Sequence, residues 1–210
     1  MAFETQIEKI SYAIGTDIGR QLQSQELELD AAALSAAICD TLNGAEPQLS
    51  GEEINAAMTA LMEQQQAKQQ RAAEAAAAAG EENRKAGEAF LAENAQRDEV
   101  VVLESGLQYE IITEGTGDKP GRDSTVEVHY AGTLINGNEF DSSIKRGQPA
   151  SFGVTQVIAG WTEGLQLMPE GSKWRFFIPA DLAYGDRAMG PHLPAGSTLI
   201  FEVELLKANI

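Results

Sequence analysis

The chain changes character at about residue 100, and this change constrains the fold more than any other feature. Before it, the sequence holds no convincing strand and is rich in Ala, Gln and Glu. After about Glu104, Gly and Pro appear together with alternating Val, Ile and Phe. Apolar residues three and four positions apart indicate helices, whereas alternation indicates half-buried strands. We therefore expect an α+β protein: an all-α N-terminal module followed by a C-terminal domain built mainly of strands.

Three helices are predicted in the first hundred residues. Thr5 with Glu8, and Ser50 with Glu53, form capping-box patterns, and Asp30 can cap a helix between them. Apolar positions that share one face follow each start: Ile7, Ile10, Ile14, Ile18, Leu34, Ile38, Ile54, Met58 and Leu61. These residues are too few for a confident independent core, so pairing with a second copy is the economical way to bury them.

The third helical stretch is long and polar. It contains no Pro between about Gly51 and Gln96, and only Gly80 and Gly87 weaken it. A continuous helix of this length would extend roughly 70 Å, so we expect a protruding stalk. The alternative for Gln64 to Ala79 is a flexible linker, but Ala and Gln favour helix. The predicted division is residues 1–60 as a helical dimerisation module, 51–103 as a long connecting helix and linker, and 104–210 as the C-terminal domain. A monomeric three-helix cap folded onto that domain is the alternative to a dimer.

A strand and hairpin pattern dominates the C-terminal domain. Val126, Val128 and Tyr130 alternate with polar or small residues, and Asn136, Gly137 and Asn138 form a turn that returns the chain to Phe140 and Asp141. By the same alternation His129 points away from Tyr130, which favours a structural role. Leu107, Tyr109 and Ile111 are predicted to alternate along an earlier strand, and residues 160–168 to form one short helix.

Four blocks in this domain carry a family resemblance: V-H-Y-A-G-T-L-I-N-G-N-E-F-D-S-S (128–143), V-I-A-G-W (157–161), L-A-Y-G (182–185) and L-I-F-E-V-E-L-L (199–206). Together they strongly resemble the FKBP-type peptidyl-prolyl cis-trans isomerases. The helical first half is similar to the macrophage infectivity potentiator subgroup. The resemblance implies an antiparallel, half-wrapped sheet around one short helix, a V-shaped homodimer, proline-containing peptides and unfolded proteins as substrates, and FK506- or rapamycin-type macrolides as inhibitors.

The resemblance also implies the site residues. Its catalytic positions are Tyr130, Asp141 and Tyr184. Its substrate- and macrolide-binding positions are Phe140, Arg146, Phe152, Val157, Ile158, Trp161, Leu193 and Phe201. Arg146 falls where it can pair with Asp141. Ala150 replaces an aromatic residue common in the family, and Met189 and His192 stand at variable rim positions, which bears on ligand affinity.

Composition limits the remaining functions. A formal net charge of −17 argues against nucleic acid as a partner. With two His, one Cys, no H-E-x-x-H and no C-x-x-C, we expect no metal and no cofactor. The sequence shows no signal-peptide pattern and no apolar run that could span a bilayer, so we expect a cytoplasmic protein without membrane contact. An isomerase is favoured; the alternative is a non-catalytic holdase chaperone or peptide-binding module.

Overall fold

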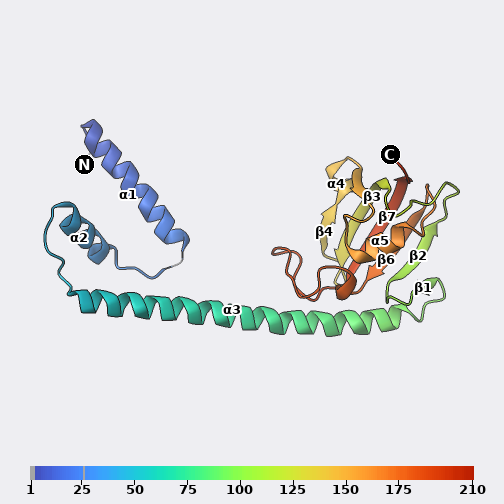
Figure 1. Cartoon of the computed structure of the whole chain (residues 1–210), viewed down its shortest axis with the longest axis horizontal. Helices are drawn as coiled ribbons and strands as arrows, with labels where there is room; N and C mark the ends of the chain where they lie inside the picture. Colours follow the sequence, from blue (N-terminus) through green and yellow to red (C-terminus); the bar gives the residue numbers. More distant parts are fainter. Residues whose placement is uncertain (1–2, 26) are drawn as a thin grey trace. The chain divides into compact units, whose positions relative to one another are not determined.

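The computed structural model describes residues 3–25 and 27–210 (Figure 1). The chain divides between Gln65 and Gln66 into two compact units. The first contains α1 (Gln6–Ser24), α2 (Ala31–Leu42) and the start of α3 (Gly51–Asn94), which is unbroken over 44 residues. The prediction of helix, not linker, for Gln64 to Ala79 is therefore confirmed. No helix among the described residues is long and apolar enough to cross a membrane.

The predicted helix starts are present in the first unit. Thr5 and Glu8 form a reciprocal capping box, and the Asp30 carboxylate accepts hydrogen bonds of 2.8 Å from the backbone N–H groups of Ala32 and Ala33. Glu53 accepts from the Ser50 N–H at 2.8 Å. These bonds satisfy N–H groups that a helix start leaves unpaired. Yet neither α1 nor α2 contains a buried residue.

The second unit is built on an antiparallel sheet of seven strands with the order β1-β2-β6-β7-β3-β4, and β5 pairs with β3. The strands are β1 (Val100–Val102), β2 (Gln108–Thr113), β3 (Thr125–Leu134), β4 (Glu139–Ser142), β5 (Ala150–Gly153), β6 (Lys173–Ile178) and β7 (Leu199–Lys207). Short helices α4 (Ser143–Arg146) and α5 (Ala159–Leu165) and a 3-10 turn, η1 (Ala180–Leu182), lie in the connections. The predicted fold class is confirmed.

The core lies between α5 and one face of the sheet. Phe176, Leu165 and Met168 are fully buried there, and Trp161 is only 3% exposed. The β3–β4 turn forms as predicted: Gly137 has φ +83°, and Leu134 N–H donates to the Asn138 carbonyl at 2.9 Å. This turn sets the register that brings Asp141 opposite Gly132 on β3.

The predicted alternation along the first strand is wrong in part. Leu107 is fully buried, but Gln108 and Glu110 are buried as well, and Ile111 is 44% exposed. The reason is that the opposite face of β2 is also covered. Gln108 forms a hydrogen bond with Asn94 of α3. Polar side chains are therefore buried at positions where the periodicity predicted exposure to solvent. Strand β1, which pairs with β2, was not predicted.

The stalk prediction is wrong for the last turns of α3. Gly80, Gly87 and Asn94 are buried, and the rings of Phe90 and Phe177 have centroids 6.0 Å apart. These α3 glycines and Asn94 recur every seven residues, which places them on one helix face. Small residues on that face let the helix lie close to Ala195 and Thr198, so this part of α3 packs within the second unit despite its polar composition.

Candidate functional site

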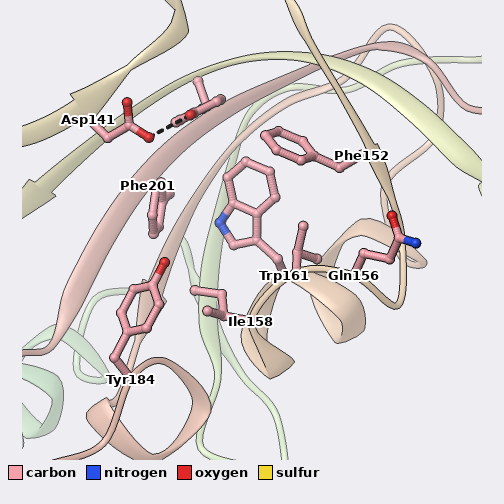
Figure 2. Close-up of a pocket in the computed structure, with 9 residues that line it drawn as sticks. Asp141, Phe152, Gln156, Ile158, Trp161, Tyr184 and Phe201 are labelled. Carbon is pink, nitrogen blue, oxygen red and sulfur yellow. Dashed lines mark hydrogen bonds between the residues drawn. The ribbon is translucent and has the colours of Figure 1, made fainter. Parts of the chain in front are cut away.

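The second unit contains a cavity of about 350 Å³ between α5, η1 and the sheet (Figure 2). Its lining is mostly aromatic and aliphatic. The lining residues are Tyr130, Asp141, Phe152, Gln156, Val157, Ile158, Trp161, Tyr184 and Phe201. An apolar cavity with a few converging polar groups is the usual form of a small-ligand site.

Three strands and the first turn of α5 place the aromatic rings. Tyr130 comes from β3, Phe152 from β5 and Phe201 from β7, and all face Trp161 on α5. Trp161 meets Tyr130 at 5.3 Å, Phe152 at 5.7 Å and Phe201 at 5.1 Å between centroids, each edge to face. This arrangement fixes Trp161 as a floor, because edge-to-face contacts are specific in geometry. Ile158, the N-cap of α5, lies beside it.

A polar network closes one wall of the cavity. The Tyr130 hydroxyl donates to Asp141 Oδ2 at 2.6 Å, and Arg146 Nη2 donates to the Tyr130 oxygen at 2.7 Å. Arg146 Nη1 also bonds Asp141 Oδ1, so the predicted ion pair is present. Burial acts to raise the pKa of Asp141, but the hydrogen bonds from Tyr130 and Arg146 and the guanidinium charge outweigh it and hold this pKa below its usual value. Burial and the neighbouring carboxylate raise the pKa of Tyr130. The network therefore presents a charged carboxylate and a neutral phenol.

Behind Tyr130, a buried hydroxyl joins β3 to the start of α4. Ser143 is fully buried, and its Oγ accepts from the Tyr130 N–H at 2.8 Å. His129 Nδ1 lies 3.1 Å from the same oxygen. The predicted hydrogen bond of His129 is present, and its structural role stays a prediction.

Comparison with known families decides the identity of this unit. Residues 117–206 match the family described as FKBP-type peptidyl-prolyl cis-trans isomerase, and residues 7–111 match the domain amino terminal to FKBP-type peptidyl-prolyl isomerase. The chain belongs to the FKBP-type peptidyl-prolyl cis-trans isomerases. The matches cover both units, so the helical half is part of the family organisation.

Individual relatives agree with this assignment to the FKBP-type isomerases. The chain is 46% identical to the outer membrane protein MIP of Legionella longbeachae, over 98% of this chain and 87% of that protein. It is 44% identical to the FKBP-type 22 kDa peptidyl-prolyl cis-trans isomerase of Escherichia coli K12, over 98% and 97%. The crystal structure of FkpA from Escherichia coli superposes with a TM-score of 0.66 at 36% identity and covers 98% of each chain. The chain is therefore a peptidyl-prolyl cis-trans isomerase.

Most of the positions carried over from the FKBP family lie on the cavity wall, but three do not. Phe140 packs behind Phe201, with centroids 5.4 Å apart, and Arg146 reaches the wall only through Tyr130 and Asp141. Leu193 is buried in the loop that follows η1. Gln156 lines the cavity and was missed. Its position on the short connection between Phe152 and Val157 was the available signal.

Proposed function

We propose that this isomerase binds the X-Pro segment in the aromatic cavity, with the proline ring on Trp161 and the reacting carbonyl facing Tyr184. Rotation about an X-Pro bond has a barrier of about 20 kcal/mol because twisting breaks amide resonance. The twisted amide is less dipolar than the planar one. An apolar cavity therefore disfavours the planar ground state more than the twisted state.

The observation that carries this proposal is the contrast between the two polar sides of the cavity. Tyr130 and Asp141 already bond each other and Arg146, so their geometry is fixed before substrate enters. The hydroxyl of Tyr184 points toward the cavity from the other side (Figure 2). Tyr184 supplies a donor that can follow the carbonyl as it rotates, while Asp141 fixes the polarity of the opposite wall. Lowering the barrier by about 7 kcal/mol would accelerate rotation roughly 10⁵-fold.

A coupled isomerisation assay on short Leu-Pro and Phe-Pro peptides tests this assignment of the cavity. Turnover should be blocked by an FK506-type macrolide that competes with the peptide, because both would occupy the same apolar volume. If Trp161 and Tyr184 variants kept full turnover and full macrolide inhibition, the reaction would have to occur elsewhere. The chain would then act at this cavity only as a peptide-binding module or holdase.

We further propose that two copies pair through the N-terminal helices and hold client proteins between their isomerase units. The support is the apolar surface of the first unit: Ile7 is 78% exposed, Ile14 55% and Met58 47% in the single chain. An apolar surface of this kind is typical of an interface. Two linked sites raise the effective concentration for a long unfolded chain. A dimer thereby adds chaperone-like client binding to the isomerase activity.

The cytoplasmic location stays a prediction, since relatives of this chain include one named as an outer membrane protein. Fractionation of cells that express the native gene, with antibody detection, tests it.

A further inference from the structure

The loop that carries Tyr184 is held from outside the cavity by α3. This loop runs from η1 to the start of β7, and the Tyr184 ring points from it toward the cavity (Figure 2). On its outer side, Asn83 of α3 donates to the Ala195 carbonyl at 2.9 Å. A Cβ on Gly87 would lie 2.1 Å from Thr198 Oγ1, so only glycine permits this approach. The loop thus rests directly on the helix.

One guanidinium spans the segment around Tyr184. Arg84 Nη1 donates to Asp181 Oδ1 at 2.7 Å, and Arg84 Nη2 donates to Asp186 Oδ1 at 2.8 Å. The two carboxylates lie on either side of Tyr184 in the sequence. Both are largely exposed, whereas the Arg84 side chain is 25% exposed. Exposed ion pairs contribute little to stability. A planar guanidinium that bonds two carboxylates can nevertheless fix the position of the segment that carries them.

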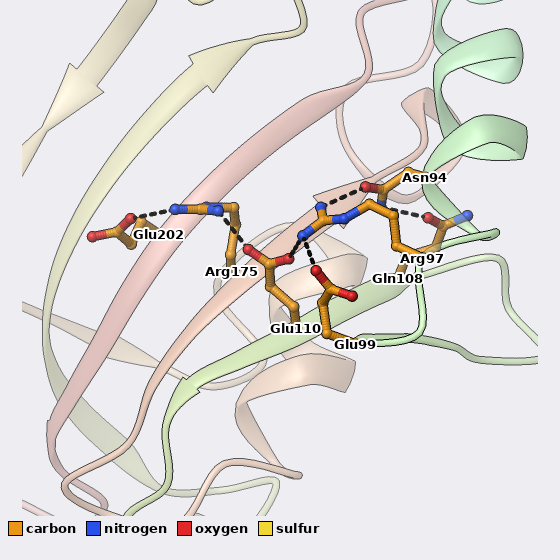
Figure 3. A network of polar contacts seen from close by, with 7 residues as sticks. All are labelled: Asn94, Arg97, Glu99, Gln108, Glu110, Arg175 and Glu202. Atoms are coloured by element: carbon orange, nitrogen blue, oxygen red, sulfur yellow. Dashed lines mark hydrogen bonds and ion pairs between the residues drawn. The ribbon is translucent and has the colours of Figure 1, made fainter.

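The same helix is fixed to the sheet independently of Arg84. Asn94 Nδ2 donates to Gln108 Oε1 at 2.9 Å, and Gln108 Nε2 donates to the Leu91 carbonyl at 2.9 Å. Just beyond the helix, Arg97 bonds Glu110, which also bonds Arg175 of β6 (Figure 3). Asn94, Gln108 and Glu110 are buried and each has a partner, and buried polar groups with satisfied hydrogen bonds make a structure rigid. The backbone that carries Arg84 is therefore a fixed reference for the loop.

We propose that Arg84 is a positioning residue for the isomerase: through Asp181 and Asp186 it holds the loop so that the Tyr184 hydroxyl stays aimed into the cavity. The inference rests on the proposed role of Tyr184 at the substrate carbonyl. Small displacements of a positioned group cost large factors in rate, because proximity and orientation supply much of the acceleration. The last turns of α3 thus help to hold the active-site loop in place, although Arg84 itself does not contact substrate.

A double-mutant cycle in the full-length chain tests the proposal. Arg84→Met keeps the aliphatic part of the side chain and removes both ion pairs. It should lower kcat/KM on an X-Pro tetrapeptide by roughly fivefold to tenfold, mainly through kcat. In a Tyr184→Phe background the same substitution should change kcat/KM by less than about twofold, because the group that it positions is already gone. Lys85→Met is the matched control, since Lys85 pairs only with Glu81 among the described contacts and both are exposed; it should leave turnover unchanged.

The outcomes separate the positioning role from the role of Tyr184. Full activity of Arg84→Met, or an equal loss with and without the Tyr184 hydroxyl, overturns the positioning role. Full activity of Tyr184→Phe overturns the proposed role of Tyr184 and, with it, any action of Arg84 through that residue. Asp181→Asn and Asp186→Asn should each cause part of the loss of kcat/KM seen in Arg84→Met. Both carboxylates are largely exposed, so their ion pairs contribute little to stability. A loss of turnover in these variants therefore distinguishes loop positioning from a general loss of stability.

Discussion

The N-terminal unit exposes its apolar residues, whereas the C-terminal unit buries them. Ile14 on α1 is 55% exposed, but Val128, Phe176 and Leu205 in the sheet are fully buried. Both sets follow a regular hydrophobic period, so the difference does not lie in the local pattern. The two units differ in whether other residues of the same chain pack over their apolar side chains. The C-terminal unit covers its apolar residues by itself, and under the proposed pairing a second copy would cover those of the N-terminal unit.

Removing residues up to Ala60 should have the largest effect on oligomeric state and on the refolding of protein clients. An unchanged oligomeric state would contradict the contrast drawn between the two units. The exposed apolar face is lost, so sedimentation at micromolar concentration should show a dimer before truncation and a monomer after it. Turnover of a tetrapeptide should survive, because one cavity accommodates it. Proline-limited refolding of a protein client should slow by about tenfold or more, since avidity between two linked sites is gone. Equal losses on peptide and protein substrates would contradict this division of labour.

Matched substitutions in the two units sharpen the contrast. Trp161→Ala removes the cavity floor and should cost about 3–5 kcal/mol of unfolding free energy, together with most of the turnover. Ile14→Glu should leave peptide turnover and the unfolding of the isomerase unit unchanged, but it should dissociate the dimer. Gln23→Glu, at an exposed position on another face of α1, is its control. Chemical denaturation and sedimentation measure the two effects, and an Ile14→Glu chain that still sediments as a dimer would exclude α1 from the interface.

The position of the boundary can be tested with two shorter chains. A chain from Glu104 lacks Phe90, Asn94 and Arg97, which cover Phe177 and pair Gln108 and Glu110. It should be less stable than a chain from Gln66 by about 2–4 kcal/mol, because buried polar groups lose partners and an apolar contact is lost. Urea unfolding of both fragments measures this difference. Equal stabilities would make the last turns of α3 dispensable to the C-terminal unit.

Polar substitutions in the cavity should affect activity more than stability. Asp141→Leu and Tyr184→Phe should each lower kcat/KM on a tetrapeptide by about tenfold, with a change in unfolding free energy of about 1 kcal/mol or less. Tyr184 is 37% exposed, so removal of its hydroxyl leaves no buried group unpaired. Thermal unfolding measured beside turnover separates the two quantities. Unchanged turnover in Asp141→Leu would reassign Asp141 as structural.

The smallest predicted effect is on the pH dependence of stability. The folded pKa of Asp141 is lowered, and an unfolded Asp has a pKa of about 3.9. The folded state therefore binds fewer protons than the unfolded state between these values. The contribution of Asp141 is complete above about pH 5 and is lost as the pH falls through the folded pKa. Asp141→Asn should flatten the acid side of the stability profile, and an unchanged acid profile would show that other carboxylates set it.

Local sequence signals predicted a large part of the fold. The capping residues Thr5, Asp30 and Ser50 start helices where expected, and Gly137 turns the chain between β3 and β4. These features depend on a few neighbouring residues, so they can be identified without knowledge of the fold. The family blocks likewise placed Tyr130, Trp161 and Phe201 at one cavity.

Tertiary structure alone decided which faces are covered. Periodicity predicted that Gln108 and Glu110 would face solvent, and composition predicted a free polar stalk; the structure packs these regions against each other. Gly80 and Gly87 look like weak points in a helix, yet they are where α3 meets the loop beyond Tyr184. A sequence specifies local backbone preference and the side of each element that is apolar. It does not specify which distant segment will satisfy a buried amide or carboxylate, because that depends on contacts between residues far apart in the chain, such as Arg84 with Asp181 and Asp186.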